Sequence, residues 1–149
     1  MMTSAATGLA ALVLAATSAA ARAGEPSEAV RPFYLEPGLE LEASARDRFI
    51  DPARKVLDQN EAIQQTGEEG CLDPALPFND TDYNAAEVLR TLSLGEIAKG
   101  DRATVVASFT AEGETQRVQW ILSRIGDAWK ISDIVSMSKD FALSRFQCE

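Results

Sequence analysis

Carboxylates and tyrosines are the side chains in this sequence that are best able to take part in catalysis, because its 149 residues include no histidine. That absence excludes a Ser-His-Asp triad, a Cys-His dyad, an H-E-x-x-H zinc site and a histidine pH switch. A carboxylate can still act as a general base when burial raises its pKa and a hydroxyl donor faces it. Tyr34 and Tyr83 are the candidate donors. Asp133 is a poor base candidate, because an acid near the end of a last strand more often accepts a backbone or arginine hydrogen bond.

Oxygen-bearing side chains alternate over residues 80–84, as in the first half of a calcium-binding loop. The match then ends, because Ala85 stands where an EF-hand requires glycine. Two interpretations remain for this stretch. One is a calcium site that uses Asp73, Asp80 and Asp82, and the other is an Asx turn that caps the following strand. We expect the turn, with no bound metal and no other cofactor.

Aromatic side chains form a second group of candidates, because they are large enough to line a ligand cavity. Tyr34, Tyr83 and Trp120 are the predicted ligand contacts. Arg124 lies in strand register with Trp120 and places a cation at the end of the same sheet face. An anionic or amphipathic ligand would fit that arrangement. The alternative is that the aromatic residues simply pack in the core.

The net charge of −9 is concentrated in one half of the chain. Residues 24–87 contain 15 acidic and 5 basic side chains, whereas residues 88–149 contain 8 of each. The negative electrostatic potential of such a segment repels nucleic acids and anionic membranes and attracts cationic partners. We therefore expect no nucleic-acid partner, and the alternative role for the acidic segment is a solvated loop that keeps the protein soluble. Six acidic residues occur without any base between Thr66 and Glu87: Glu68, Glu69, Asp73, Asp80, Asp82 and Glu87.

The first 23 residues differ in composition from the rest of the chain. An apolar run over 9–16 is too short to span a bilayer, and it is followed by an A-x-A site at 21–23. This pattern is typical of a cleaved secretory signal peptide. We predict that residues 1–23 are removed, that 24–149 form a single domain, and that this domain is periplasmic or extracellular without membrane insertion. The alternative is an Ala-rich leader that stays attached.

Cys71 and Cys148 are the only two cysteines in the sequence. Two cysteines in an oxidising compartment are expected to pair, so we predict a disulfide that tethers the C-terminal tail to the middle of the chain. The competing interpretation, a reactive thiol pair, lacks a C-x-x-C spacing.

Helical patterns occupy the first half of the chain and strand patterns the second half. Ser27 is a candidate cap for a short helix that ends near Leu35, and Asp51 is a candidate cap for a helix that continues to about Ile63. No period is visible between Gly67 and Ala85, so a draped loop is expected there. The remaining expected elements are a charged helical stretch over 39–50, strands over 88–98, 103–110, 116–124 and 128–135, and a short helix over 139–146 capped by Ser138.

This order of elements predicts an α+β fold, in which N-terminal helices pack on a curved four-stranded antiparallel sheet and a short C-terminal helix follows. Over about residues 30 to 135 the chain resembles the cone-shaped superfamily named after nuclear transport factor two. More narrowly, it is similar to a domain-of-unknown-function family of exported bacterial proteins. The residues that carry the resemblance are Pro32-Phe33-Tyr34, Leu76-Pro77-Phe78, Asp80 to Tyr83 and the Trp129-Lys130-Ile131-Ser132-Asp133-Ile134 ending.

The resemblance implies a pocket between the helices and the concave face of the sheet. Some members of the superfamily only bind ligands there, and enzymic members usually place a His or Asp base against a Tyr or Asp donor. Because this chain has no histidine, we expect a non-enzymatic small-ligand or partner-binding module of the bacterial envelope. The alternative is an acidic protein inhibitor or immunity-type factor, and a carboxylate-based isomerase or dehydratase ranks third. A ligand binder requires an enclosed cavity, whereas an inhibitor requires a rigid, exposed acidic loop over a filled interior.

Overall fold

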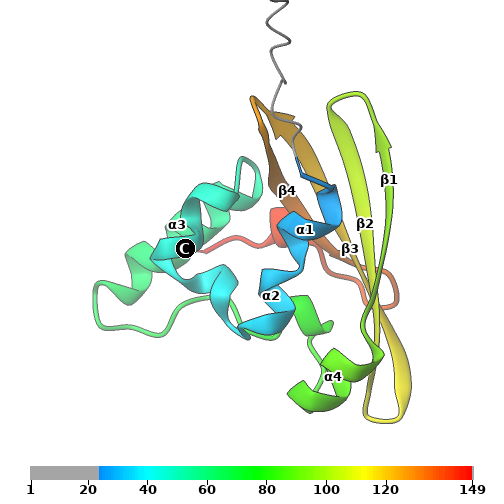
Figure 1. Ribbon diagram of the computed structural model, residues 1–149. Coiled ribbons are helices and arrows are strands. Elements are labelled where there is room, and N and C mark those ends of the chain that lie inside the picture. The colour runs from blue at the N-terminus through cyan, green and yellow to red at the C-terminus, as the bar shows by residue number, and fades with distance from the viewer. Residues whose placement is uncertain (1–23, 149) are drawn as a thin grey trace, which may run out of the picture.

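The computed structural model describes residues 24–148, so the predicted signal peptide lies outside the described residues. One antiparallel sheet forms one layer, and helices and loops cover a single face of it (Figure 1). The expected α+β class is confirmed. No helix within residues 24–148 has the length and apolar character needed to cross a bilayer.

The sheet is a meander in which each strand pairs with the next one in the sequence. Two-residue turns join the strands, and each turn contains a glycine with positive φ, at 100, 113 and 126. Period-two burial is clearest in the second strand, where every other side chain from Ala103 to Ala111 is buried. The strands are β1 (Ser93–Lys99), β2 (Arg102–Ala111), β3 (Glu114–Ile125) and β4 (Ala128–Ser136), so the last three predicted strands are confirmed.

The first predicted strand is wrong over its initial residues, because α4 (Ala85–Thr91) occupies them. The side chain of Asn84 accepts a hydrogen bond from the backbone N–H of Glu87 at 3.0 Å and so caps this helix. The expected Asx-type cap therefore exists, but it begins a helix rather than a strand. Val88 is a β-branched residue and so favours a strand by propensity, but its side chain is buried from this helix, and burial outweighs that preference.

The helical layer is more broken than the sequence pattern suggests. The stretch 39–50 forms two 3₁₀ segments separated by the extended backbone of Glu42. Neither Ser27 nor Asp51 provides a side-chain cap. The C-terminal helix is a single 3₁₀ turn, shorter than expected, because the extended residue Ala142 pairs with Val135 in an antiparallel bridge just before it. The segments are α1 (Pro26–Val30), α2 (Pro32–Leu35), 3₁₀ turns Leu39–Leu41 and Ala43–Arg48, α3 (Ala53–Gln64), and 3₁₀ turns Leu76–Phe78 and Leu143–Arg145.

Aromatic rings fill the space between the two layers. Trp120 on β3 is fully buried, and its indole Nε1 donates a hydrogen bond of 2.9 Å to the hydroxyl of buried Tyr34 on α2. The ring of Tyr34 also lies 5.6 Å from that of Phe78 and 5.7 Å from that of Phe109. The ring of Phe33 lies 5.1 Å from that of Trp120. These contacts join α2, the sheet and the loop after α3 into one packed core.

The Trp120–Tyr34 hydrogen bond gives a direct test of this core. Tyr34→Phe removes the acceptor and leaves the buried indole N–H unsatisfied, which costs about 1–3 kcal/mol of unfolding free energy. Tyr83→Phe is the matched control, since its half-buried ring keeps the same packing, and its effect should stay within about 0.5 kcal/mol. Urea unfolding of both variants measures the difference, and equal losses would contradict the assigned hydrogen bond.

Candidate functional site

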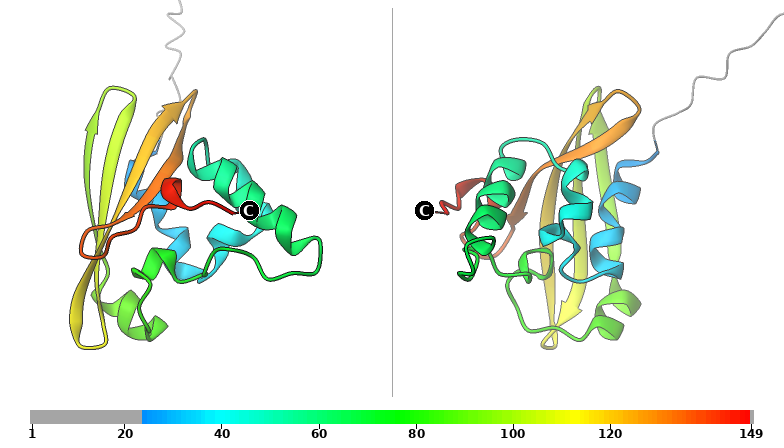
Figure 2. Two further views of the ribbon diagram at one scale, coloured as in Figure 1. Left: turned by 180° about the vertical axis from the view of Figure 1, so that it is seen from behind. Right: turned by 90° about the vertical axis from the view of Figure 1, so that its left-hand side faces the viewer.

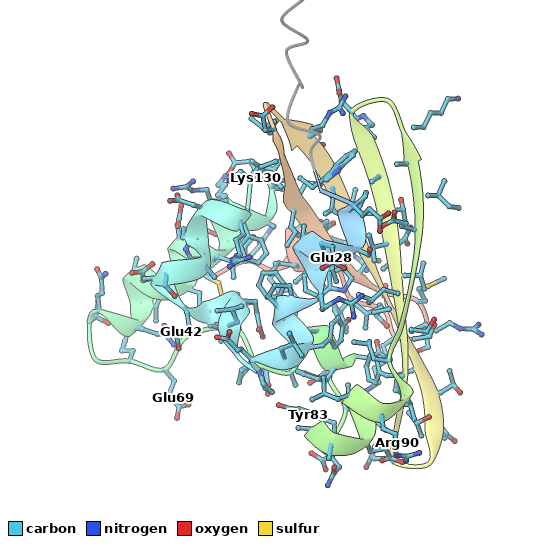
Figure 3. The ribbon with its side chains drawn as sticks, viewed as in Figure 1. Glu28, Glu42, Glu69, Tyr83, Arg90 and Lys130 are labelled. Carbon is cyan, nitrogen blue, oxygen red and sulfur yellow. A yellow bond between two sulfur atoms is a disulfide. The ribbon has the colours of Figure 1, made fainter. Side chains whose placement is uncertain are left out.

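The loop between α3 and α4, residues 65–84, contains five exposed carboxylates and is called the central loop below. It runs along one end of the molecule, and Glu69 and Tyr83 mark positions near its two ends in Figure 3. A surface hollow of about 450 Å³ lies within it. The residues that border this hollow are Asp73, Ala75, Asp80, Thr81, Asp82 and Tyr83.

A disulfide fixes the first part of the central loop. The predicted bridge between Cys71 and Cys148 is present, with the two Cα atoms 5.5 Å apart. It places the C-terminal tail beside α3, as the views in Figure 2 also show. Asn60 on α3 reinforces this anchor, because its side-chain oxygen accepts the N–H of Leu72 at 3.0 Å. A side chain at Gly70 would collide with that amide, since its Cβ would lie 2.3 Å from the Asn60 oxygen.

Asn79 fixes the second part of the central loop to the sheet. This residue is completely buried and has a positive φ of 62°. Its amide nitrogen donates to the side-chain oxygen of Gln116 at 2.8 Å and to the hydroxyl of Ser138 at 3.0 Å, while its oxygen accepts the hydroxyl of Ser136 at 2.6 Å. Asparagine tolerates the left-handed conformation better than most residues. The network therefore holds the loop backbone in an unusual conformation.

An aromatic stack and the side chain of Lys139 also attach the central loop to the rest of the protein. The ring of Tyr83 stacks on that of buried Phe78, with centroids 3.8 Å apart and planes at 7°. The amine of Lys139 donates to the backbone carbonyl of Asp80 and, at 3.0 Å, to the hydroxyl of Thr81. The loop is thus held at Cys71, at Asn79 and at Tyr83, and its carboxylates project from a fixed backbone.

Glu40 lies in the 3₁₀ turn Leu39–Leu41, the first of the two 3₁₀ turns between α2 and α3. Its side chain is completely buried, and no other residue among 24–148 donates a hydrogen bond to either carboxylate oxygen. Burial is the main reason that the pKa of Glu40 is raised to about 8; a hydrogen bond from its own backbone N–H opposes the rise, and the charge of Asp73 adds to it. In turn, partial burial followed by the charges of Glu40 and Asp73 raises the pKa of Tyr83. Asp73 and Tyr83 both border the hollow, whereas Glu40 is buried and does not border it.

Sequence reasoning missed Glu40. The available signal was its position in Leu39-Glu40-Leu41, where it is flanked by two leucines just after the turn at Gly38. This position places the carboxyl group toward the core rather than toward water. Glu40 has the raised pKa that a carboxylate base requires, but no exposed surface through which a substrate reaches it in this structure.

The four predicted ligand contacts do not gather at one site. Tyr34 and Trp120 lie together in the core, where their polar atoms bond to each other, and burial raises the pKa of Tyr34 far above its usual range. Tyr83 borders the surface hollow. Arg124 is exposed at the far end of β3, pairs with Asp101 at 3.0 Å and lies 5.8 Å from the ring of Trp129. A ligand role for these residues stays a prediction.

The carboxylates of the calcium alternative border one hollow, but residues 24–148 hold no group of three side chains suited to a metal ion. Asp73 instead accepts the backbone N–H of Ala75 at 2.9 Å, which forms a local Asx turn. As expected, Asp133 accepts backbone hydrogen bonds, from Ile134 and Ser144 at 2.9 Å each.

Replacement of Asn79 tests the attachment of the loop. Asn79→Ala leaves several buried polar groups unsatisfied and places a Cβ residue other than asparagine at positive φ, so we expect a loss of about 2–4 kcal/mol. Asn79→Gly removes the same hydrogen bonds without the backbone strain, because glycine adopts positive φ freely, so its loss of unfolding free energy should be smaller. The control, Asn84→Ala, removes only an exposed helix cap and should cost about 1 kcal/mol. Urea unfolding ranks the three variants, and hydrogen exchange at residues 75–83 should accelerate only when Asn79 is changed.

The buried carboxyl group of Glu40 should make stability depend on pH. Between about pH 4.5 and pH 8 the folded protein keeps a proton on Glu40 that the unfolded chain releases, so this contribution to stability falls as pH rises. Glu40→Gln has no such proton, and the variant should therefore gain about 2–4 kcal/mol relative to wild type between pH 5 and pH 8. Urea midpoints at both pH values test this. Glu42→Gln, at an exposed neighbouring position, should show no such trend.

Comparison with known proteins reveals a fold likeness but no relative in sequence. The sequence matches no protein-family model, and it is not significantly similar to any curated protein. A chain in the crystal structure of the type VI native effector–immunity complex Tae3–Tai3 from Ralstonia pickettii matches with a TM-score of 0.52 and 18% identity, covering 78% of this chain and 97% of that chain. A chain of the selenomethionine form matches with the same TM-score and identity, covering 78% of this chain and all of that one.

At 18% identity this likeness concerns the fold alone. It does not test the resemblance to the superfamily named after nuclear transport factor two, which stays a prediction. The match spans nearly the whole of the neighbouring chain, so it covers the combination of helical layer and sheet rather than one motif. This chain therefore shares its fold with a component of a type VI effector–immunity complex.

Proposed function

We propose that this protein is an exported, immunity-type inhibitor that binds a protein partner through its central loop. The observation that carries the proposal is the rigid attachment of this loop, which displays exposed carboxylates over an interior filled with aromatic rings. This combination is the one expected of an inhibitor rather than of a ligand-binding module.

Rigidity matters because a fixed loop loses little conformational entropy when a partner binds. The central loop is held covalently at Cys71, by hydrogen bonds at Asn79 and by stacking at Tyr83, so its carboxylates are presented in the free protein much as they would be in a complex. The net charge of −9 also accelerates encounter with a cationic partner.

The small-ligand alternative has less support. The side chains expected to line a cone-like cavity, Tyr34 and Trp120, are fully buried against each other, and the hollow at the central loop lies on the surface. The disulfide agrees with export to an oxidising compartment. The solved neighbour comes from an effector–immunity complex, which makes a protein the natural class of partner to test.

Site-specific photo-crosslinking tests this proposal. The full chain is expressed in its native host cells with a photoreactive residue at Pro74, beside the hollow, or at Ile97 on β1, whose side chain is 78% exposed. Neither position removes a carboxylate. We expect an adduct with one discrete protein from position 74, but not from position 97, and excess untagged wild-type protein should compete it away.

The captured protein is then purified and assayed for its own activity. Wild-type chain should inhibit that activity at one-to-one stoichiometry, whereas a variant with Asp73, Asp80 and Asp82 changed to asparagine should inhibit at least tenfold more weakly, as the loss of several charge contacts predicts. No protein adduct at position 74, adducts at position 97 only, or unchanged inhibition by the neutral variant would each overturn the proposal.

A further inference from the structure

We propose that two copies of this chain associate through the free edge of β1, with the Ile97 side chains of both copies in contact at a two-fold axis. This inference goes beyond the proposed function, because it concerns an edge of the sheet and not the central loop. Figure 3 places Glu69, in the central loop, and β1 on opposite sides of the molecule.

The chain covers one edge of its sheet and leaves the other open. Phe49 forms a parallel bridge with Ile131 of β4. Ala142 forms an antiparallel bridge with Val135 of the same strand. On the side of β1 that faces away from β2, no segment of residues 24–148 forms a bridge, and β1 is the outermost strand in Figure 1 and in the left view of Figure 2. Its unpaired backbone groups can therefore extend the sheet.

β1 lacks the features that commonly block pairing at an open edge, which are a bulge, a proline or a very short strand. Its seven residues pair with β2 in continuous register from Ser93 to Lys99, and none of them is proline. Its one acidic side chain, Glu96, is already bonded within the chain, because its carboxylate accepts the backbone N–H of Ser27 at 2.7 Å. The edge is thus regular enough to pair with another strand.

Ile97 gives this edge an apolar centre. With 78% of its side chain exposed, it is the most exposed large apolar residue among those described. It lies opposite Thr104 of β2, and Thr104 lies opposite Ile121 of β3. Opposite residues share a face of the sheet, so these three side chains form a row on the face without helices. Ile97 becomes buried only if a further strand continues this row.

Two of the antiparallel registers that β1 could form with its own copy are unfavourable. Opposite residues in a continuous sheet point to the same face, so the two-fold axis must pass through a residue position. An axis at Glu96 places two carboxylates directly opposite each other, which is destabilising. An axis at Gly95 leaves Ile97 opposite the polar side chain of Ser93.

An axis at Ile97 avoids both problems. The two Ile97 side chains then lie opposite each other, and the row on the uncovered face continues from one copy into the other. Glu96 lies opposite Ala98 of the other copy. Lys99 lies opposite Gly95 of the other copy. Each charged side chain therefore faces a small uncharged residue, and no like charges lie directly opposite each other.

A second copy suits this edge better than the partner of the central loop. That partner would bind on the opposite side of the molecule and leave β1 uncovered. Charge does not oppose the contact between copies, because residues 93–102 contain two acidic and two basic side chains. The contact is also closed, since it uses the open edge of each copy and leaves only the covered β4 edges at the ends of the joint sheet.

Sedimentation equilibrium tests the association. The full chain is expressed in its native host cells, purified with its disulfide intact and studied between about 5 and 500 µM. We expect a reversible equilibrium between monomer and dimer, without larger species. Ile97→Lys places two ammonium groups opposite each other at the axis and should weaken the dimer by about tenfold or more.

Ile125→Lys is the matched control. It changes an isoleucine of β3 that is 54% exposed and pairs with Ala128 of β4 rather than with the β1 side of the sheet. This substitution should leave the dimer unchanged. Urea unfolding confirms that both lysine variants are folded before they are compared.

Engineered cysteines test the register. Ile97→Cys places two thiols opposite each other at the axis, and mild oxidation should join the two copies, because the native cysteines are already paired with each other. Lys99→Cys is the control, since its two thiols lie on opposite sides of the axis and out of reach of each other. Non-reducing electrophoresis should show a covalent dimer for the first variant only.

Failure of this inference is distinct from failure of the proposed function. A monomer at every concentration, an unchanged dimer with Ile97→Lys, or equal crosslinking of the two cysteine variants would each overturn the dimer and leave the inhibitor function standing. A photoreactive residue at position 97 should join two copies of this chain and capture no other protein. If position 74 captures nothing while the dimer forms as described, the inhibitor function fails and the dimer stands.

Discussion

The hydrogen bonds of one buried asparagine determine the shape of the surface that this protein presents. Asn79 lies in the left-handed region and is bonded through its side chain to Gln116 on β3 and to Ser136 and Ser138 at the end of β4. A loop backbone in a sparsely populated conformation persists only where the surrounding structure fixes it. The sheet supplies that fixed framework, because β3 pairs along its length with β2 and β4 in a four-stranded meander whose β3–β4 register shifts once, between Ile121 and Leu122.

The other anchors act on different parts of the same loop, and their effects are complementary. The disulfide at Cys71 limits how far the chain can separate from α3, whereas the stack of Tyr83 on Phe78 positions the last residues before α4. A covalent tether reduces the entropy of the unfolded chain without specifying a conformation, while directional hydrogen bonds specify the conformation. The central loop needs both kinds of restraint, because its two prolines disfavour an α-helix or a strand and its only regular element is the 3₁₀ turn Leu76–Phe78.

Short-range sequence patterns were sufficient to predict those elements of the fold that do not depend on contacts between distant residues. Alternation along β2 and β3, together with glycine turns, was sufficient for three strands, and the count of two cysteines was sufficient for the disulfide. The helix at Ala85–Thr91 was not predicted, because its cap at Asn84 competes with the strand preference of Val88 and only burial decides the outcome. The site depends on contacts across long sequence distances, such as Asn79 with Gln116, and these leave no local pattern. Glu40 was missed because the leucines on either side of it are a weak signal, and only tertiary packing decides that its carboxyl group is buried.

The glutamic acid at position 40 makes the stability of the fold depend on pH. A leucine there would pack without polar cost, and a buried acid to which no other residue donates a hydrogen bond costs stability even when it is neutral. The protonated form is the state that burial favours, because ionisation of the carboxyl group in the interior would cost still more free energy. Titration of this one group therefore ties the stability of the fold to pH, which a leucine at the same position would not do.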